Sequence, residues 1–417
     1  MIIIFLAVLL LIGAPIAVSI GLSGFYALVQ NGISIDVFAR TLFAGVDSFS
    51  LMAIPFFIYA GDLMLAGGIS KRLIDFAKRL VGRITGGLPI AGVMSSMIFA
   101  AISGSSPATV AAIGGIMIPS LNEAQYPKRF TLGLMSAAGT LGIIIPPSIT
   151  LLVYGGAAEV SISDLFIAGI IPGIFIGIVL MIASYIVAKR AGIKSEETVS
   201  FVELWHSFRK AVWGLVLPII ILGGIYTGIF TPTEAAGVAI VYSMLIGAFI
   251  YKELNLKNLI QITIKSVVTS AMIMLIIASA NIFSWYLTYQ QIPAKLASVI
   301  LGFADTQLMF LLMVTVILLI AGMFLDASAA VLIFTPLFLP ITMELGIDPV
   351  HFGVIMIVNL AIGMITPPFG LNLYVAAGIS KMPIMEVIKG VLPFIIILIM
   401  ALFVIMFVPQ LSLFLVK

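Results

Sequence analysis

The chain has 417 residues, of which 62% are hydrophobic and only 9% are charged, and its mean hydropathy is +1.29. Soluble domains carry about 25% charged residues, so a soluble fold of this length is excluded and we expect a polytopic membrane protein. The lack of cysteine excludes disulfides, thiol nucleophiles and Cys-ligated metals. The two histidines, His206 and His351, fall in predicted loops, which argues against a haem or multi-histidine centre, and nothing indicates a nucleic-acid partner.

Nine apolar runs are each long enough for one membrane crossing, since a spanning helix needs about 20 apolar residues. In chain order they are residues 2–28, 49–67, 130–157, 164–188, 211–229, 233–251, 258–283, 352–379 and 388–415. The first run is interpreted as a full span, because it has neither the basic start nor the cleavage site of a signal peptide.

Two further runs, 88–121 and 306–340, are too long for one crossing and too short for two. Each is interrupted at its centre by small polar residues, SGSSP at 103–107 and LDAS at 325–328. Irregular backbone at membrane depth is tolerated only where it is buried in protein or lines a cavity. The sequence therefore predicts two re-entrant hairpins with polar tips.

The distribution of basic residues supports these hairpins. If the chain starts in the cytoplasm, crosses nine times and each hairpin returns to its own side, all basic residues except Arg40, Lys295 and Lys417 are cytoplasmic. Cytoplasmic loops of membrane proteins carry this excess of positive charge. The predicted topology has a cytoplasmic N-terminus and places the C-terminus on the opposite side.

The chain contains an internal repeat. Prolines and glycines recur at an offset of 221 positions: Pro119 with Pro340, Pro146–Pro147 with Pro367–Pro368, Pro172 with Pro393, Gly142 with Gly363, and Gly169 with Gly390. The same offset aligns Ser105 with Asp326, at the two hairpin tips. Five predicted crossings separate equivalent positions, so the halves 1–210 and 211–417 are expected to be inverted. Such repeats are typical of secondary transporters that bind substrate near mid-membrane.

A Pro-Pro pair interrupts one helix of each half, in GTLGIIIPPS (139–148) within 130–157 and in GMITPPFGLN (363–372) within 352–379. Two prolines remove two N–H donors and break the helix. The freed carbonyls can bind a cation, and the half-helix that follows can bind an anion at its N-terminus. The alternative is a kink that serves packing alone; two copies at one offset favour a functional break.

The hairpin tips supply oxygen ligands, which hard cations such as Na⁺ prefer. They are Ser103, Ser105, Ser106 and Thr109 in the first tip, and Asp326 and Ser328 in the second. Asp326 is the only acid predicted near the middle of the membrane, where a carboxylate needs a partner. A neutral, helix-capping Asp326 is the alternative, and small residues such as serine also serve close helix packing.

Two amphipathic segments, about 69–83 and 290–303, precede the hairpins in the two halves. Helices of this kind lie along the membrane interface. Their paired positions indicate arms that link a mobile core to a scaffold, and a generic lipid-facing anchor is the alternative.

The sequence closely resembles the large membrane (M or DctM-type) subunit of tripartite ATP-independent periplasmic (TRAP) transporters over essentially its whole length. The resemblance is carried by IPFFIYAGDLM (54–64), SGSSPATVAAIG (103–114), GIIIPPS (142–148), TPTEAAGVA (231–239), LDASAA (325–330) and TPPFGLN (366–372). It implies an all-α, elevator-type importer of organic acids (sialic acids, C4-dicarboxylates or related carboxylates) in a bacterial inner membrane, driven by Na⁺. The C-terminus would then be periplasmic.

The resemblance also implies two protein partners, a periplasmic substrate-binding protein and a small Q-type membrane subunit. No Q-type segment precedes residue 1, so the small subunit is expected to be a separate chain.

Carried over to this sequence, the family pattern predicts three groups of site residues. The first Na⁺ site would use Ser103, Ser106, Gly139, Gly142 and Ile144, the last three through their backbone. The second would use Asp326, Ser328, Gly363 and Thr366. Substrate would lie near Ser105, Pro147, Ser148, Pro368 and Asn372. Because no Arg or Lys is predicted at mid-depth, helix N-termini, hydroxyls or the sodium ions would hold the substrate carboxylate.

Three other classes fit less well. A channel needs a continuous polar pore, whereas the polar groups gather at two tips. An enzyme needs a nucleophile–base or metal constellation, and the spans contain neither cysteine nor a predicted histidine. A proton-coupled transporter with Asp326 as the proton carrier is the nearest alternative.

Overall fold

The computed structural model describes residues 2–193, 200–303 and 306–416, and all regular structure in this part of the chain is helical. Eight of the described helices are long and apolar enough to cross a membrane, and a bent helix pair adds a ninth candidate. The prediction of an all-α polytopic protein is confirmed. Two basic residues of the topology argument, Lys194 and Lys417, lie outside the described residues.

The first apolar run is a helical hairpin, so the prediction of a single span over 2–28 is wrong. Helix α1 (Ile2–Leu11) and helix α2 (Ile16–Gln30) fold back on each other, and the ring of Phe5 stacks on that of Tyr26 with centroids 4.6 Å apart. The turn contains Gly13, whose φ of +83° suits glycine, and Pro15 directly precedes α2. Hydropathy is the same for a span and for a hairpin, so it did not reveal the reversal.

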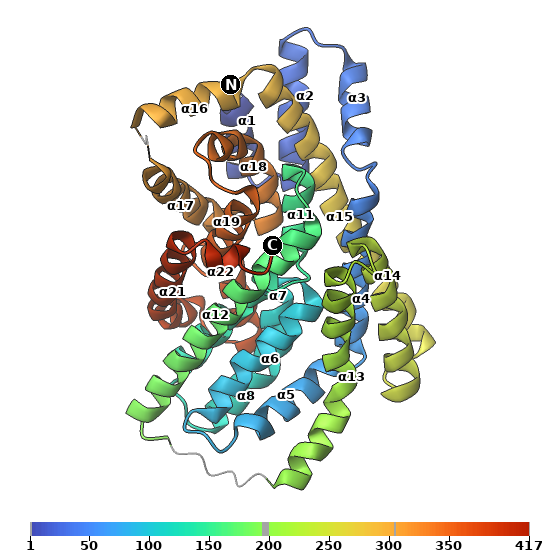
Figure 1. Ribbon diagram of the computed structural model, residues 1–417, viewed down its shortest axis with the longest axis vertical. Coiled ribbons are helices and arrows are strands. Elements are labelled where there is room, and N and C mark those ends of the chain that lie inside the picture. Colours follow the sequence, from blue (N-terminus) through green and yellow to red (C-terminus); the bar gives the residue numbers. More distant parts are fainter. Residues whose placement is uncertain (1, 194–199, 304–305, 417) are drawn as a thin grey trace.

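Helices α2, α4 and α15 form one side of the molecule (Figure 1). Helix α15 (Leu256–Tyr289) has 34 residues, about 51 Å, and packs along α2, α3 (Ile35–Ala44) and α4 (Ala53–Ala66). A 3₁₀ turn (Phe49–Met52) leads into α4, which also packs on α14 (Pro232–Leu245). Helix α13 (Phe201–Tyr226) and a π-helix (Ile246–Ile250) complete this side, which we call the scaffold.

Both predicted hairpins are present as helix–break–helix units. The first comprises α6 (Gly87–Ser103), α7 (Ser106–Thr109), a π-helix (Val110–Gly114) and α8 (Gly115–Glu123). The second comprises α17 (Gln307–Phe324) and α18 (Ala327–Glu344), and Gln307 Nε2 donates to Leu345 O over 2.7 Å where its outer ends meet. Each helix of the second hairpin has 18 residues, long enough to cross by itself.

Both Pro-Pro helices are broken where the sequence predicts. The first consists of α9 (Lys128–Gly139), α10 (Leu141–Ile144) and α11 (Ile149–Ala158), with a bend of 42° before α11. The second consists of α19 (Pro349–Gly363) and α20 (Leu371–Ser380). The peptide bonds Pro146–Pro147 and Pro367–Pro368 are both cis. His351 lies in α19 and His206 in α13, so the prediction that both are in loops is wrong.

The broken helix of each half packs against the long helix of the other half. Helix α9 contacts α21 (Ile384–Phe407), and α19 contacts α12 (Ile162–Arg190). The contact of α9 with α21 is close because Gly133 faces the Gly390 carbonyl. Tyr154 of α11 donates to Pro349 O over 2.6 Å, and the short helix α22 (Gln410–Leu413) follows α21. Together with the two hairpins, these helices form the core.

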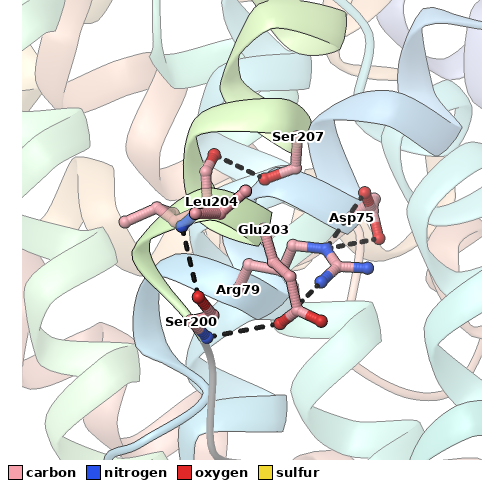
Figure 2. Close-up of polar contacts among 7 residues, drawn as sticks. Asp75, Arg79, Ser200, Glu203, Leu204 and Ser207 are labelled. Atoms are coloured by element: carbon pink, nitrogen blue, oxygen red, sulfur yellow. Dashed lines mark hydrogen bonds and ion pairs between the residues drawn. The ribbon is translucent and has the colours of Figure 1, made fainter.

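Both predicted arms are helical, as α5 (Ile69–Val81) and α16 (Ile292–Phe303). Helix α5 buries Ile69, Leu73 and Ala77 and packs between α6 and α13. Figure 2 shows the polar link between α5 and the start of α13: Arg79 lies 3.4 Å from Asp75 and 3.4 Å from Glu203, whose carboxylate also caps α13 through Ser200 N. The arm is thus tied to the scaffold on one side and to the first hairpin on the other.

Candidate functional site

A cavity of about 380 Å³ brings the two hairpin tips together and places them against the scaffold helices α4 and α15. Ser103 and Ser105 line it from the first tip, and Asp326 and Ser328 from the second. The remaining lining residues are Ile58, Gly61, Asp62, Leu65, Phe99, Gly104, Pro107, Ala108, Ile143, Ile149, Thr150, Lys265, Thr269, Met272, Ile273, Ile276, Ala327 and Met364.

The first tip forms a compact cluster of oxygens. Gly104, at φ +60°, turns the chain after α6, and its carbonyl accepts a bond from Ile149 N over 3.3 Å, which ties the tip to α11. Thr109 Oγ1 donates to Ser105 O over 2.8 Å and lies 3.2 Å from Ser103 Oγ. A Cβ at Gly142 would collide with Ser105 O and Thr109 Oγ1. Glycine at this position therefore lets the broken helix approach the cluster.

Asp326 caps the helix that follows the second tip. Its carboxylate accepts a bond from Ser328 N over 2.9 Å, and its backbone is extended at φ −63° and ψ 145°. A residue of this type at this position satisfies free N–H groups of the first helical turn. The capping role proposed as an alternative is therefore present in the structure, and the same half-buried carboxylate lines the cavity.

Asn372 connects the second broken helix to the first hairpin. Its Nδ2 donates to Ser106 Oγ over 2.8 Å and lies 3.4 Å from Ser136 O, and the side chains of Asn372 and Ser106 are fully buried. The amide oxygen, Asn372 Oδ1, is buried and has no hydrogen-bond partner among the described residues. Asn359 Oδ1 and several other buried polar atoms among the described residues are also without a partner, so the geometry beside Ser106 is what distinguishes Asn372.

The other predicted site residues lie around the cavity rather than in its wall. Ser148 caps α11 by accepting from Leu151 N, and its hydroxyl donates to Ile143 O over 2.7 Å. Thr366, just after the end of α19, donates to Ile362 O of that helix over 2.7 Å, and Gly363 lies against Gly322 of α17. The residues Gly139, Gly142, Ile144 and Pro147 are buried at the first break, whereas Pro368 is exposed at the second.

Sequence reasoning missed the charged pair in the cavity wall. Lys265 of α15 donates to Asp62 of α4 over 2.8 Å, and Ser266 donates to the other Asp62 oxygen over 2.7 Å. Lys265 is predicted in a cytoplasmic segment and no cation is predicted at mid-depth; neither prediction anticipates its place in the cavity lining. The available signal was its position inside an apolar spanning run, where an ionisable residue indicates a functional site.

Polar groups gathered where broken helices and hairpins meet are characteristic of membrane transport proteins, and a multi-pass membrane transporter is the class that this fold and cavity define. Residues 3–411 match the family described as "Tripartite ATP-independent periplasmic transporter, DctM component". The chain belongs to this family, that of the large permease components of TRAP transporters, as its motifs indicated.

Known proteins resemble the chain in sequence and in fold. The C4-dicarboxylate TRAP transporter large permease protein DctM of Pseudomonas aeruginosa is 48% identical over 95% of this chain and 93% of its own length. The isethionate TRAP transporter permease protein DctMQ of Oleidesulfovibrio alaskensis is 43% identical over 98% of this chain, which spans 65% of that protein. The solved Alcanivorax borkumensis YdaH transporter has the same fold, with a TM-score of 0.64 at 17% identity, covering 90% of this chain and 89% of that one.

Proposed function

We propose that the chain is the large permease of a Na⁺-coupled importer that moves an organic acid across the bacterial inner membrane by an elevator mechanism. The proposal rests on one observation above the others: both polar tips line a single cavity, which scaffold helices close on the other side. A site enclosed between two bodies becomes accessible to either side of the membrane when one body moves past the other.

For the coupling ion we propose two Na⁺ sites beside the tips. At the first, the oxygens of Ser103, Ser105 and Thr109 lie together in the buried tip, and the unpartnered Asn372 Oδ1 adjoins Ser106. At the second, Asp326 supplies the carboxylate, with Ser328, Gly363 and Thr366 nearby in the chain. Hydroxyl, carbonyl and carboxylate oxygens are the donor set that a hard monovalent cation requires.

For the substrate we propose an organic anion, with a C4-dicarboxylate as the first candidate and a sialic acid as another carboxylate to test. The C4-dicarboxylate relative supports this order. Lys265 is the one cation among the described residues that line the cavity, and its side chain is 65% exposed, so it can reorient toward an anion. Ser105 and the start of α11 offer further donors, as predicted for the substrate site.

For the movement we propose that the core slides as a body relative to the scaffold, with α5 and α16 as the arms. The repeat supports this division, because each half contributes one arm, one hairpin, one broken helix and one long helix, and the broken helices pack across the halves. We retain the inverted repeat, with halves at 1–210 and 211–417, as part of this proposal.

For the orientation we propose that the basic loops face the cytoplasm. Because α1 and α2 form a hairpin, the N-terminus then lies on the periplasmic side, opposite to the earlier prediction. Figure 1 shows the N-terminus at the end of the molecule where α16 lies, away from the basic helix α5. The excess of basic residues on the cytoplasmic side is the same in this topology, because the N-terminal hairpin starts and ends on the periplasmic side.

We further propose two protein partners: a small membrane subunit and a periplasmic protein that delivers the substrate. The DctMQ relative, of which this chain spans 65%, supports the first partner and leaves a separate or a fused chain as alternatives. In proteoliposomes that contain the small subunit, uptake of labelled succinate, sialic acid or isethionate should occur for at least one anion and only with the matching binding protein. Uptake that needs no binding protein would contradict the tripartite proposal.

A proton-coupled mechanism is the second candidate, and Asp326 favours it because a cavity-lining carboxylate can carry a proton. The two mechanisms differ in their ion requirement, so replacement of Na⁺ by choline during uptake distinguishes them.

A further inference from the structure

A second cavity, of about 720 Å³, lies outside the transport site, where the arm α5 meets the scaffold and the first hairpin. Helix α5 lines it with Lys71, Arg72, Asp75 and Lys78, helix α13 with Arg209, Lys210 and Trp213, and the segment after α14 with Ile250, Tyr251 and Glu253. Ile74 and Ile116 complete the lining. The cavity therefore has five basic and two acidic side chains in its wall.

Both acidic groups are already paired. Glu253 lies 2.7 Å from Arg72, whose guanidinium also stacks 3.8 Å above the ring of Tyr251. Asp75 pairs with Arg79 in the link between α5 and α13 that Figure 2 shows. These contacts fix one side of the cavity and neutralise its acids, so they leave the remaining cations without internal compensation.

Three of those cations have no anionic partner among the described residues. Lys71, Arg209 and Lys210 form no ion pair in the described part of the chain, and Lys78 contacts only the neutral hydroxyl of Ser120, at 3.1 Å. Lys71, Arg209 and Lys210 are exposed residues of two helices that line the same cavity, where an anion with several acceptor oxygens can bind them together. Arginine in particular matches the geometry of a phosphate group.

The rim of the cavity indicates the source of that phosphate. Trp213 is 40% exposed, Ile250 42% and the neighbouring Phe249 72%, so apolar side chains on this membrane protein border the basic cavity. A phosphate with attached acyl chains satisfies both parts of this surface, whereas a soluble phosphate satisfies only the basic part. Basic pockets between helices at the membrane surface bind anionic lipid headgroups.

We propose that the cavity between α5, α13 and the 250–253 segment is a binding site for the phosphate headgroup of an anionic phospholipid. The lipid phosphate contacts Lys71, Arg209 and Lys210, and its acyl chains lie along Trp213, Ile250 and Phe249. A lipid in this place joins arm, scaffold and first hairpin at once, because Ile116 and Ser120 belong to the hairpin. The site is distinct from the transport cavity and does not depend on which anion is carried.

Trp213 provides a reporter inside the proposed site. The chain has three tryptophans, so the full-length variant Trp205→Phe/Trp285→Phe leaves Trp213 alone. In phosphatidylcholine vesicles, acyl-brominated phosphatidylglycerol should quench Trp213 at a several-fold lower mole fraction than acyl-brominated phosphatidylcholine. The further change Lys71→Gln/Lys210→Gln should abolish this preference, because each cation near an anionic lipid contributes about five-fold.

The matched control is Lys189→Gln/Arg190→Gln, which removes the same charge at the end of α12, away from the cavity. It should keep the preference, and all variants should keep the melting temperature. Equal quenching by the two lipids, a preference that survives Lys71→Gln/Lys210→Gln, or an equal loss in the control would overturn the proposal. Relief of quenching by millimolar inorganic phosphate would also overturn it, because the cavity would then bind a soluble anion.

Discussion

Asn372 donates a hydrogen bond of 2.8 Å to Ser106, and this bond joins residues that are 266 positions apart in the chain. Asn372 lies in the first turn of the half-helix after the second break, and Ser106 begins the half-helix after the first tip. Both are fully buried, so a polar bond connects the two halves at the level where their backbones are irregular. Such buried pairs are costly to break because the group that remains loses its partner.

Asn372→Ala should therefore lower stability and abolish uptake together. The substitution leaves Ser106 Oγ buried without its donor, which costs about 1–3 kcal/mol. The measurement is thermal unfolding in detergent combined with uptake in proteoliposomes.

Asn359→Ala is the matched control, since Asn359 is equally buried but its amide donates within its own helix, to Ile355 O. We expect it to keep uptake. If Asn372→Ala transports normally, the bond between the halves does not belong to the site.

Asp326 can be tested for capping and for ion binding separately. Asparagine caps helices nearly as well as aspartate, so Asp326→Asn should keep the melting temperature but lose the dependence of uptake on Na⁺. Asp326→Ala should lose the Na⁺ dependence of uptake and also have a lower melting temperature, because the missing cap lowers stability by about 1 kcal/mol. Na⁺ titrations of uptake and melting curves for the two variants provide the comparison. Wild-type Na⁺ dependence in Asp326→Asn would show that this carboxylate only caps the helix.

Lys265→Met should weaken anion uptake more than it weakens the fold. The Lys265–Asp62 pair is partly exposed, with 65% and 17% of the side chains accessible, so its loss should cost about 1 kcal/mol or less. Removing the cation should raise the KM for the transported anion about ten-fold. The double variant Lys265→Met/Asp62→Asn removes both charges and should keep the raised KM, because the substrate still lacks its counter-ion. A wild-type KM in the double variant would mean that the pair only connects α4 with α15.

Cross-links test the proposed movement of the core, and the lack of cysteine makes every introduced thiol unique. A Cβ at Gly156 of the core helix α11 would lie 3.0 Å from the Leu51 side chain, next to α4 of the scaffold. Leu51→Cys/Gly156→Cys, joined by a short bis-methanethiosulfonate reagent that forms a disulfide with each thiol, should stop uptake, and reduction of the disulfides should restore it.

The control pair lies within the scaffold. A Cβ at Gly21 of α2 would lie 3.5 Å from the Ser279 Cβ of α15, a spacing that suits a disulfide. Gly21→Cys/Ser279→Cys should transport when oxidised. Normal uptake by the cross-linked Leu51–Gly156 pair would exclude an elevator movement between these two surfaces.

The positions of the breaks could be predicted because they depend on local chemistry. Adjacent prolines such as Pro146–Pro147 cannot continue a helix, and Gly104 permits the turn at the first tip. Helix α5 could be predicted because it combines apolar and basic residues at helical spacing. These signals are contained in a few neighbouring residues, so no knowledge of the packing is needed.

The missed features depend on contacts between distant segments. The N-terminal reversal has a local signal in Gly13 and Pro15, but hydropathy does not register it, and packing between residues such as Phe5 and Tyr26 holds it. Lys265 enters the cavity wall because α15 packs against α4, where Lys265 meets Asp62. The bond between Asn372 and Ser106 likewise requires the fold to bring two breaks together. The Na⁺ and substrate roles of these residues remain predictions.

Replacement of the coupling ion tests the central claim most directly. Proteoliposomes that contain the chain, its small subunit and the loaded binding protein should take up anion when Na⁺ is present outside. Replacing Na⁺ by choline should abolish that uptake, and an inwardly directed proton gradient in choline should not restore it. Uptake that continues in choline and follows the proton gradient would contradict Na⁺ coupling and assign Asp326 the role of proton carrier.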